Sequence, residues 1–318
     1  MKLSIIAPVY NEADNLRELY NSLAIILVPL GYEWELVFVD DGSTDQSPSI
    51  MREFLDEQKY SLQIIEFRRN FGQTAAIAAG IEYAKGDIII LLDADLQNDP
   101  ADIPLLLNKM EEGFDVVSGW RKNRKDNLFL RTIPSKIANG LISSVTGLKL
   151  HDYGCTLKAY RREFLGMFRL YGEMHRFIPV YAAASGAKVA EVVVNHRPRR
   201  NGKSNYGLDR TIKVILDLFT VKFLMSYSAK PMRLFGGVGL GLMVLSTAAL
   251  LFLAVRKIFF STSVLESPLF VISVLMFILG FISILLGMIA ELLIRTYYET
   301  QGKSTYAIRA ITNSEPEK

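Results

Sequence analysis

Residues 88–97 read IIILLDADLQ, an apolar run that passes directly into two aspartates and a glutamine. A short run without polar residues is typical of a strand that is buried on both faces. Alternate residues of an extended segment point the same way, so we expect Asp93, Asp95 and Gln97 to present oxygen atoms on one side. Such hard oxygen ligands suit Mg²⁺ or Mn²⁺ holding a diphosphate, and they suit zinc poorly.

The segments before this run alternate between strand and helix patterns. Short apolar runs predict strands over residues 3–9, 33–39, 62–67 and 87–92, and helical patterns fall between them, including residues 43–58 and 72–84. This alternation predicts an α/β fold with a mostly parallel sheet and right-handed crossovers. A ligand crevice is then expected at the carboxyl ends of the strands, where polar residues such as Asp40 and Asp93 follow the apolar runs.

Two carboxylates, Asp40 and Asp41, follow the second predicted strand. A carboxylate at such a strand end can accept a hydrogen bond from a ribose hydroxyl or a nucleobase imide. The alternative is a helix cap with a turn glycine, which would account for Gly42 to Thr44 but not for both aspartates.

Four polar motifs occur along the chain at the ends of the predicted strands: PVYNE at 8–12, DDGSTD at 40–45, RNFGQ at 69–73 and DADLQ at 93–97. Together they resemble the GT-A domain of family 2 glycosyltransferases, and in particular the polyprenyl-phosphate glycosyltransferases. The resemblance covers residues 1–210 and implies a Rossmann-like catalytic domain with a metal-dependent, inverting transfer reaction. It is less specific for the sugar.

The resemblance also implies site residues. The nucleoside would be held by Pro8, Tyr10, Glu12, Asp40 and Asp41, the nucleotide or sugar would lie beside Asp93 and Ala94, and the metal would be ligated by Asp95 and Gln97. Asp152, an acidic residue before a glycine, would join Asp93 and Asp95 as a catalytic residue. The segment RRNGKSN at 199–205 resembles a family loop over the donor diphosphate, through Arg199 and Lys203, although Asn205 stands where the family has lysine.

The charge of the chain is unevenly distributed. Residues 1–115 carry 8 basic and 21 acidic side chains, whereas residues 116–230 carry 21 basic and 7 acidic ones. This pattern favours a metal and nucleoside site facing a site for phosphates or anionic lipid, with unequally solvated surfaces as the alternative. By resemblance, Arg121, Arg131 and Ser135 bind the acceptor phosphate. Residues 131–145 are predicted to form an amphipathic helix on the membrane surface or, alternatively, in the core.

Two uncharged runs near the C-terminus, residues 234–255 and 267–290, each exceed the roughly 20 residues that span a bilayer. Their glycines favour close helix contacts in lipid, and the alternative is a pair of buried helices in a soluble protein. The outer flanks carry more basic residues than the connecting loop, which predicts cytoplasmic termini. The N-terminus lacks the pattern of a signal peptide, and the single cysteine, Cys155, cannot form an internal disulfide.

The predicted organisation is a cytoplasmic GT-A domain over 1–210, an amphipathic juxtamembrane helix over 211–230, a two-helix transmembrane hairpin over 231–295 and a cytoplasmic tail over 296–318. The predicted function is inverting transfer of one hexose from a nucleotide sugar to a polyprenyl phosphate at the cytoplasmic membrane. UDP-glucose is the preferred donor, with GDP-mannose or another UDP-sugar as the alternative. We expect lipid bilayer and homo-oligomer contacts and no nucleic-acid partner.

The sequence disfavours two other functions. A processive polysaccharide synthase would carry a Gln-x-x-Arg-Trp signature, but the tryptophans at 34 and 120 do not follow arginine. A non-catalytic nucleotide-sugar sensor or scaffold would more easily lose Asp93, Asp95 or Gln97, and all three are present.

Overall fold

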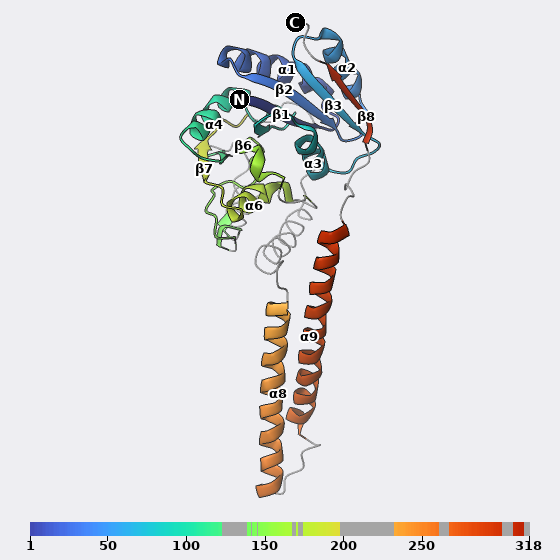
Figure 1. Ribbon diagram of the computed structural model, residues 1–318, viewed down its shortest axis with the longest axis vertical. Helices are drawn as coiled ribbons and strands as arrows, with labels where there is room; N and C mark the ends of the chain where they lie inside the picture. The colour runs from blue at the N-terminus through green and yellow to red at the C-terminus, as the bar shows by residue number, and fades with distance from the viewer. Residues whose placement is uncertain are drawn as a thin grey trace. The chain divides into compact units, whose positions relative to one another are not determined.

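The computed structural model describes residues 1–122, 139–140, 142–144, 146–166, 170, 174–197, 232–260, 267–300 and 308–314. The chain forms two compact units (Figure 1). The first contains Met1–Val221 together with Ser304–Lys318, and the second contains Lys222–Lys303. The C-terminal residues therefore return to the unit in which the chain begins.

The first unit is built on an eight-stranded sheet with the order β7-β5-β6-β4-β1-β2-β3-β8. Its strands are β1 (Lys2–Val9), β2 (Glu33–Asp40), β3 (Ser61–Phe67), β4 (Ile88–Leu91), β5 (Val116–Trp120), β6 (Lys158–Arg161), β7 (Val189–Val193) and β8 (Ile308–Ser314). Strands β4, β1, β2 and β3 are parallel neighbours. The predicted parallel series is confirmed, and its strand bounds agree within one residue.

Two antiparallel strands complete the sheet. Strand β6 runs antiparallel to both β4 and β5, and β8 runs antiparallel to β3. Residues 296–318 were expected to form a cytoplasmic tail, but β8, which lies within them, adds a strand to the sheet of the first unit. Its sequence, IRAITNS, lacks the long apolar run that marks the central strands, because an edge strand is covered less on its two faces.

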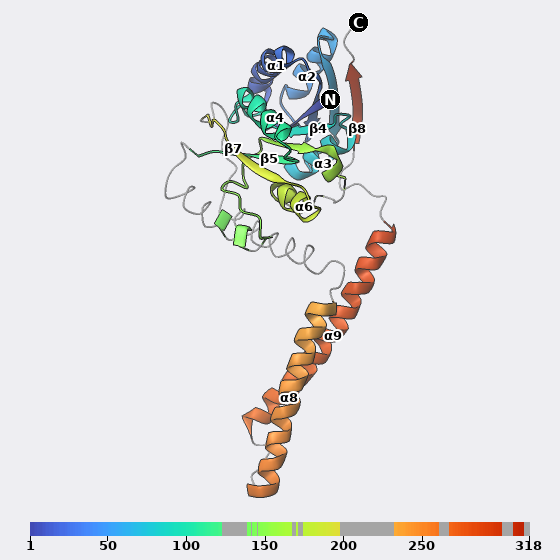
Figure 2. The ribbon, with the colours of Figure 1, turned by 60° about the vertical axis from the view of Figure 1, so that its left-hand side comes forward.

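Helices cover both faces of the sheet. Among the described residues, this unit contains the α-helices α1 (Ala13–Leu27), α2 (Ser47–Glu57), α3 (Gln73–Tyr83), α4 (Ile103–Glu111) and α6 (Ile178–Ala184). It also contains the short 3-10 helices η1 (Val28–Leu30), η2 (Pro100–Asp102), η4 (Arg162–Phe164) and η5 (Met174–Phe177). Figure 2 shows α1 and α3 on opposite sides of the strands.

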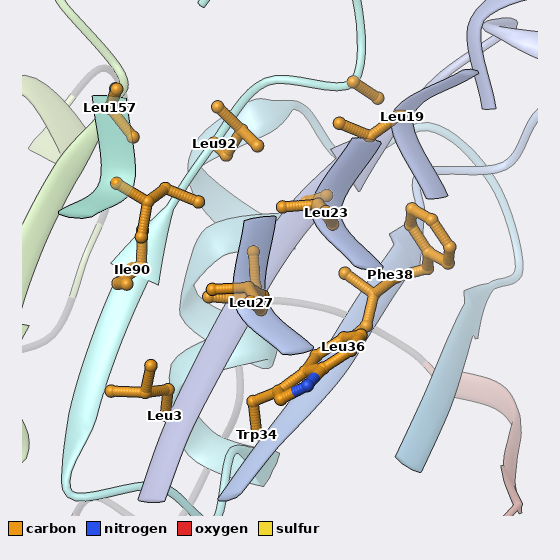
Figure 3. Close-up of a cluster of buried hydrophobic side chains, with 14 of the residues drawn as sticks. Leu3, Leu19, Leu23, Leu27, Trp34, Leu36, Phe38, Ile90, Leu92 and Leu157 are labelled. Atoms are coloured by element: carbon orange, nitrogen blue, oxygen red, sulfur yellow. The ribbon is translucent and has the colours of Figure 1, made fainter. Parts of the chain in front are cut away.

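Strand periodicity explains how the two faces are filled. Leu3 and Ile5 of β1 pack into the core cluster with the leucines of α1, which Figure 3 shows together with β2 and β4 side chains. Ile6 points to the other face, where a Cβ on Gly80 of α3 would collide with it. Helix α3 therefore lies unusually close to the sheet, because glycine leaves room for Ile6.

The second unit is a pair of antiparallel helices, α8 (Met232–Phe260) and α9 (Pro268–Thr300). Small residues at heptad spacing form the seam between them, with Gly239 and Ser246 facing Gly280 and Ser273. Two hydroxyls cross the seam: Ser246 Oγ donates to the Ser273 carbonyl at 2.6 Å, and Ser283 Oγ donates to the Phe235 carbonyl at 2.8 Å. Small residues and such bonds are how helices associate in lipid.

Large apolar side chains cover the outside of this helix pair, for example Phe252 at 56% exposed and Leu275 at 54%. The segments Leu234–Phe259 and Pro268–Ala290 are long and apolar enough to cross a membrane. A soluble protein would rarely expose so much apolar surface, so lipid is the environment that fits this unit.

The seam can be tested with two glycines of α8. A Cβ on Gly239 would lie 2.5 Å from the carbonyl oxygen of Gly280, whereas nothing lies within 4 Å of a Cβ on Gly241. We expect Gly239→Ala to lower the thermal stability of the detergent-solubilised protein by several degrees and Gly241→Ala to leave it unchanged or slightly raised, since alanine favours helix. Size-exclusion chromatography after heating measures this, and equal behaviour of the two variants would contradict the packing.

Candidate active site

The carboxyl ends of the parallel strands bring the predicted motifs to one edge of the sheet. Val9 pairs with Asp40, and Asp40 pairs with Glu66, so β1, β2 and β3 end side by side. Strand β4 ends next to β1 through the pair Ile6 and Leu91. The four motifs, far apart in the sequence, therefore lie together at one edge of the sheet, where a parallel sheet commonly binds its ligands.

The ends of β1 and β2 are joined by side chains of the PVYNE and DDGSTD motifs. The side-chain oxygen of Asn11 accepts a hydrogen bond from the backbone amide of Thr44 at 2.8 Å. The backbone amide of Asn11 donates to Ser43 Oγ at 3.0 Å. Asp45 accepts from the Ala13 amide at 3.1 Å. These bonds fix the loop that carries Tyr10, which is 42% exposed and open to a ligand.

Asp40 and Asp41 are both buried, but they differ in what they hold. Asp40 accepts from the Ser43 amide at 3.0 Å, whereas Asp41 accepts from the amides of Phe71 and Gly72 at 2.6 and 2.9 Å. Burial raises the pKa of both carboxyls. Asp41 thus uses both oxygens to anchor the start of α3, a structural role that sequence reasoning did not anticipate.

Gly42 explains why these loops can meet. Its φ is +73°, and a Cβ there would lie 2.5 Å from the Arg69 carbonyl carbon. Only glycine permits both this backbone conformation and this close approach. The DDGSTD and RNFGQ motifs are therefore in direct backbone contact.

The DADLQ motif does not continue the strand. Strand β4 ends at Leu91, residues 94–95 form a turn, and Leu96 has a φ of +59°. The expectation that Asp93, Asp95 and Gln97 share one side of an extended segment was wrong, because alternation ends where the chain turns. The turn instead brings Asp95 and Gln97 into contact, because the backbone amide of Gln97 donates a hydrogen bond to Asp95 Oδ1 at 3.1 Å.

Asp93 lies between two side-chain donors. Gln73 Nε2 donates to one of its oxygens at 2.7 Å, and Thr156 Oγ1 donates to the other at 2.6 Å. The neighbouring Ala94 is buried, so only its backbone is available to a ligand.

Asp152 forms a buried ion pair with Arg121. Arg121 Nε and Nη2 donate to the two carboxylate oxygens at 2.7 and 3.0 Å, and their side chains are 10% and 6% exposed. Burial alone would lower the pKa of Arg121, but the charge of Asp152 raises it above its usual value. The two residues, assigned to separate roles by resemblance, therefore act as one unit.

Further cations lie around this pair. A Cβ on Gly154 would be 3.3 Å from both Arg121 Nη2 and Arg176 Nη1, so two guanidinium groups converge there. Lys158 is buried beside them and donates to the Tyr153 carbonyl at 3.0 Å. Burial lowers the pKa of Lys158 to about 8. This side of the site therefore carries three cationic side chains around one carboxylate.

Residues 4–167 match the protein family described as "Glycosyl transferase family 2". It is 43% identical over 314 residues to dodecaprenyl-phosphate galacturonate synthase of Rhizobium johnstonii, covering 98% of this chain and 93% of that protein. The chain belongs to glycosyl transferase family 2. A second relative, undecaprenyl-phosphate 4-deoxy-4-formamido-L-arabinose transferase of Pseudomonas fluorescens, is 36% identical over 315 residues, covering 99% and 91%.

Solved structures show that this glycosyltransferase has the GT-A fold. Glucosyl-3-phosphoglycerate synthase from Mycobacterium tuberculosis, in complex with Mn²⁺, UDP and phosphoglyceric acid, matches with a TM-score of 0.55 at 19% identity, covering 70% of this chain and 78% of that one. TarS of S. aureus, residues 1–349 in complex with UDP-GlcNAc, matches with a TM-score of 0.51 at 20% identity, covering 70% and 67%. The predicted fold class and enzyme class are confirmed.

Some predicted positions of the glycosyltransferase lie outside the described residues: Arg131, Ser135, Arg199 and Lys203. The same applies to the predicted juxtamembrane helix over 211–230 and to most of the predicted helix over 131–145. Pro8 and Glu12 lie at the β1 end with Tyr10, as expected. His196 follows β7 and forms a β-bridge with Asn98.

Sequence reasoning missed Gln73, Thr156 and Arg176. Gln73 is the last residue of the RNFGQ motif, and Thr156 lies four residues after Asp152. Their partners are distant in the sequence, at separations of 20 and 63 residues, so no local pattern could reveal them.

The ion pair yields a prediction. Removing one partner of a buried ion pair costs about 3–5 kcal/mol, because the other charge remains buried and unpaired. We expect Arg121→Gln or Asp152→Asn alone to lower the thermal stability strongly, and the double variant, a neutral amide pair, to recover most of it. Thermal unfolding of the three proteins measures this, and an additive loss in the double variant would contradict the coupling.

Proposed function

We propose that this glycosyltransferase moves one sugar from a nucleotide sugar to a polyprenyl phosphate, with inversion, at the cytoplasmic face of the membrane. The observation that carries the proposal is the match over 98–99% of the chain, hairpin included, to two proteins named for transfer to dodecaprenyl or undecaprenyl phosphate. The two apolar helices support it, because a lipid-linked acceptor stays in the bilayer.

In the proposed reaction, an acceptor phosphate oxygen forms a bond to the anomeric carbon while the bond to the departing nucleoside diphosphate breaks. The acceptor phosphate is largely ionised near neutrality, since the second pKa of a phosphate monoester is about 6. The nucleophile therefore needs placement and charge shielding more than a strong base. Arg121 would shield it, together with Arg131 and Ser135, and Asp152 would orient the Arg121 guanidinium.

On the donor side, Pro8, Tyr10, Glu12 and Asp40 would hold the nucleoside at the ends of β1 and β2. Asp41 would support them indirectly, since it anchors the start of α3. Asp93 and Ala94 would lie beside the nucleotide or sugar. Arg199 and Lys203 would cover the diphosphate.

The DADLQ turn fits a hard divalent cation. Asp95 and Gln97 offer oxygen donors, and the described residues contain no group of three His, Cys, Asp or Glu that could hold a metal alone. Mg²⁺ commonly binds in this way, with one or two protein ligands and substrate phosphates. When bound, Mg²⁺ or Mn²⁺ would neutralise charge on the leaving diphosphate.

For the donor, we favour an acidic hexose, galacturonate, over the glucose expected from the sequence. The 43% identical relative is named for galacturonate, and neither relative is named for glucose. Arg176 and Lys158, which lie beside the Arg121–Asp152 pair, support an anionic sugar, because these cations would attract a carboxylate on the donor.

A substrate screen tests the proposal. Purified protein in detergent, with Mn²⁺ or Mg²⁺ and a short polyprenyl phosphate, is offered UDP-galacturonate, UDP-glucose, GDP-mannose and the UDP-linked 4-deoxy-4-formamido-L-arabinose, and lipid-linked sugar is detected by mass spectrometry. We expect the strongest signal with UDP-galacturonate. Transfer from glucose alone would overturn the donor assignment, and no transfer from any donor would overturn the proposed acceptor.

The cation assignment gives a second prediction. Asp95→Asn removes one anionic ligand, so we expect turnover to fall at least tenfold while the protein stays folded and membrane-bound. Asp99→Asn, a neighbouring carboxylate that pairs with Arg197, serves as the control and should keep most activity. Full activity of Asp95→Asn, or undiminished wild-type activity in excess EDTA, would contradict the cation site.

The membrane topology is part of the proposal. Strand β8 shares a sheet with β1–β7, which supports placing both ends of the helix pair on one side of the membrane. Basic residues outside the pair favour the cytoplasm, and the inner membrane is the proposed location. Homo-oligomer formation remains a prediction, for which the exposed Gly237 and Gly241 offer a contact surface.

Single cysteines test the topology. In a Cys155→Ser background, cysteine replacing Ser261 or Ser263 in the connecting loop should react with an impermeant thiol reagent added to intact cells, and cysteine replacing Ser304 should not. Reaction of all three positions only after the cells are opened would contradict the predicted orientation.

A further inference from the structure

The start of α3 is held by a carboxylate at a strand end and by close packing of the helix on the sheet. The Asp41 carboxylate accepts from the Phe71 and Gly72 amides, and Gly72, with a φ of +95°, ends the turn. One turn into the helix, the small residues Ala76 and Ala79 are fully buried, and Gly80 packs on Ile6 of β1. The backbone of Gln73 is therefore placed by a strand end and by close helix packing.

From this fixed backbone, Gln73 reaches Asp93. Its amide nitrogen lies 2.7 Å from Asp93 Oδ1, and on the other side Thr156 Oγ1 lies 2.6 Å from Oδ2. The two donors come from different elements, one from α3 and one from the segment before β6. Each carboxylate oxygen has two lone pairs, so Asp93 keeps acceptor capacity for a ligand while both donors stay in place.

Such a clamp matters because a carboxylate has a soft final torsion. The χ2 angle of aspartate is broad, so a single hydrogen bond would leave the plane of the carboxylate poorly defined. Two donors on opposite oxygens define that plane, and polar groups of an active site lose effect when they are turned or displaced.

We propose that Gln73 and Thr156 are positioning residues that fix the Asp93 carboxylate for contact with the donor sugar. The proposal rests on the proposed function to the extent that the sugar of the donor lies against Asp93. It assigns a role to the last residue of the RNFGQ motif, which otherwise has none in the reaction. It also separates the duties of the DADLQ turn: Asp93 faces the sugar in a fixed orientation, and Asp95 and Gln97 serve the cation.

The test uses pairs of variants that keep or remove one donor. Thr156→Val is close to isosteric and lacks the hydroxyl, whereas Thr156→Ser keeps it. Gln73→Met keeps the length of the side chain and lacks the amide donor. Gln46→Ala is the matched control, since Gln46 is an exposed glutamine at the start of α2 whose side chain makes no cap hydrogen bond.

Binding and transfer are both measured on the full-length protein in detergent with Mn²⁺. The binding measurements give the affinities for UDP, UDP-galacturonate and UDP-glucose. The transfer measurements give kcat and KM with a short polyprenyl phosphate as the acceptor. We expect Thr156→Val and Gln73→Met each to lower kcat about ten- to a hundredfold, the range for one hydrogen bond to a charged group. UDP affinity should stay within twofold of wild type, and Thr156→Ser should recover most of the lost kcat.

Several outcomes would overturn the proposal. Unchanged kcat and sugar-nucleotide affinity in both Thr156→Val and Gln73→Met would show that the clamp has no part in the reaction. Equal losses in Thr156→Ser and Thr156→Val would show that the hydroxyl is not the cause. A parallel fall in UDP affinity would show that the whole donor site has collapsed.

The binding arm also separates this proposal from the proposed function. If wild-type protein binds a sugar nucleotide but transfers nothing to polyprenyl phosphate, the acceptor assignment fails. In that case, a selective loss of sugar-nucleotide affinity over UDP affinity in Thr156→Val still supports the clamp, and equal affinities overturn it.

Discussion

The carboxylate of Asp41 joins the end of β2 to the start of α3, and much of the site depends on that junction. Its two oxygens satisfy the Phe71 and Gly72 amides, which would otherwise be unpaired donors where a loop turns into a helix. Gly42 allows the two loops to touch. With α3 fixed in this way, Gln73 meets Asp93, and the β2, β3 and β4 motifs become one connected structure.

Two chemical environments meet at this edge of the sheet. The ends of β1, β2 and β4 carry carboxylates and hydroxyls with local hydrogen bonds, which suits a nucleoside and a hard cation. The segment around Asp152 carries the Arg121–Asp152 ion pair and the buried Lys158. A donor between them would have its diphosphate and its sugar in contrasting electrostatic surroundings, which is the arrangement that a charged leaving group and a charged nucleophile require.

The helix pair follows a different packing logic from the sheet. In water, apolar burial would drive two such helices together, but in lipid the outside is already apolar, so small residues and hydroxyl bonds must supply the contact. Gly239 and Gly280 let the backbones approach, and Ser246 and Ser283 bond to carbonyls of the opposite helix. Strand β8 follows the helix pair in the sequence and belongs to the sheet. Both ends of the helix pair are therefore linked to the first unit.

The sequence by itself determined the parallel strands, the two membrane-length helices and the enzyme family, because apolar runs, helical spacing and ordered motifs are local properties of the chain. It also placed Asp40, Asp93 and Asp95 at strand ends. Only the tertiary structure decided which of these side chains meet. Asp41 turns to the α3 amides, Asp93 lies between Gln73 and Thr156, and the DADLQ segment bends at Leu96 where sequence reasoning extended the strand. Strand β8 likewise has little signal of its own, since an edge strand is defined by the partner it pairs with. These features depend on contacts between residues distant in the chain, and no local pattern encodes such contacts.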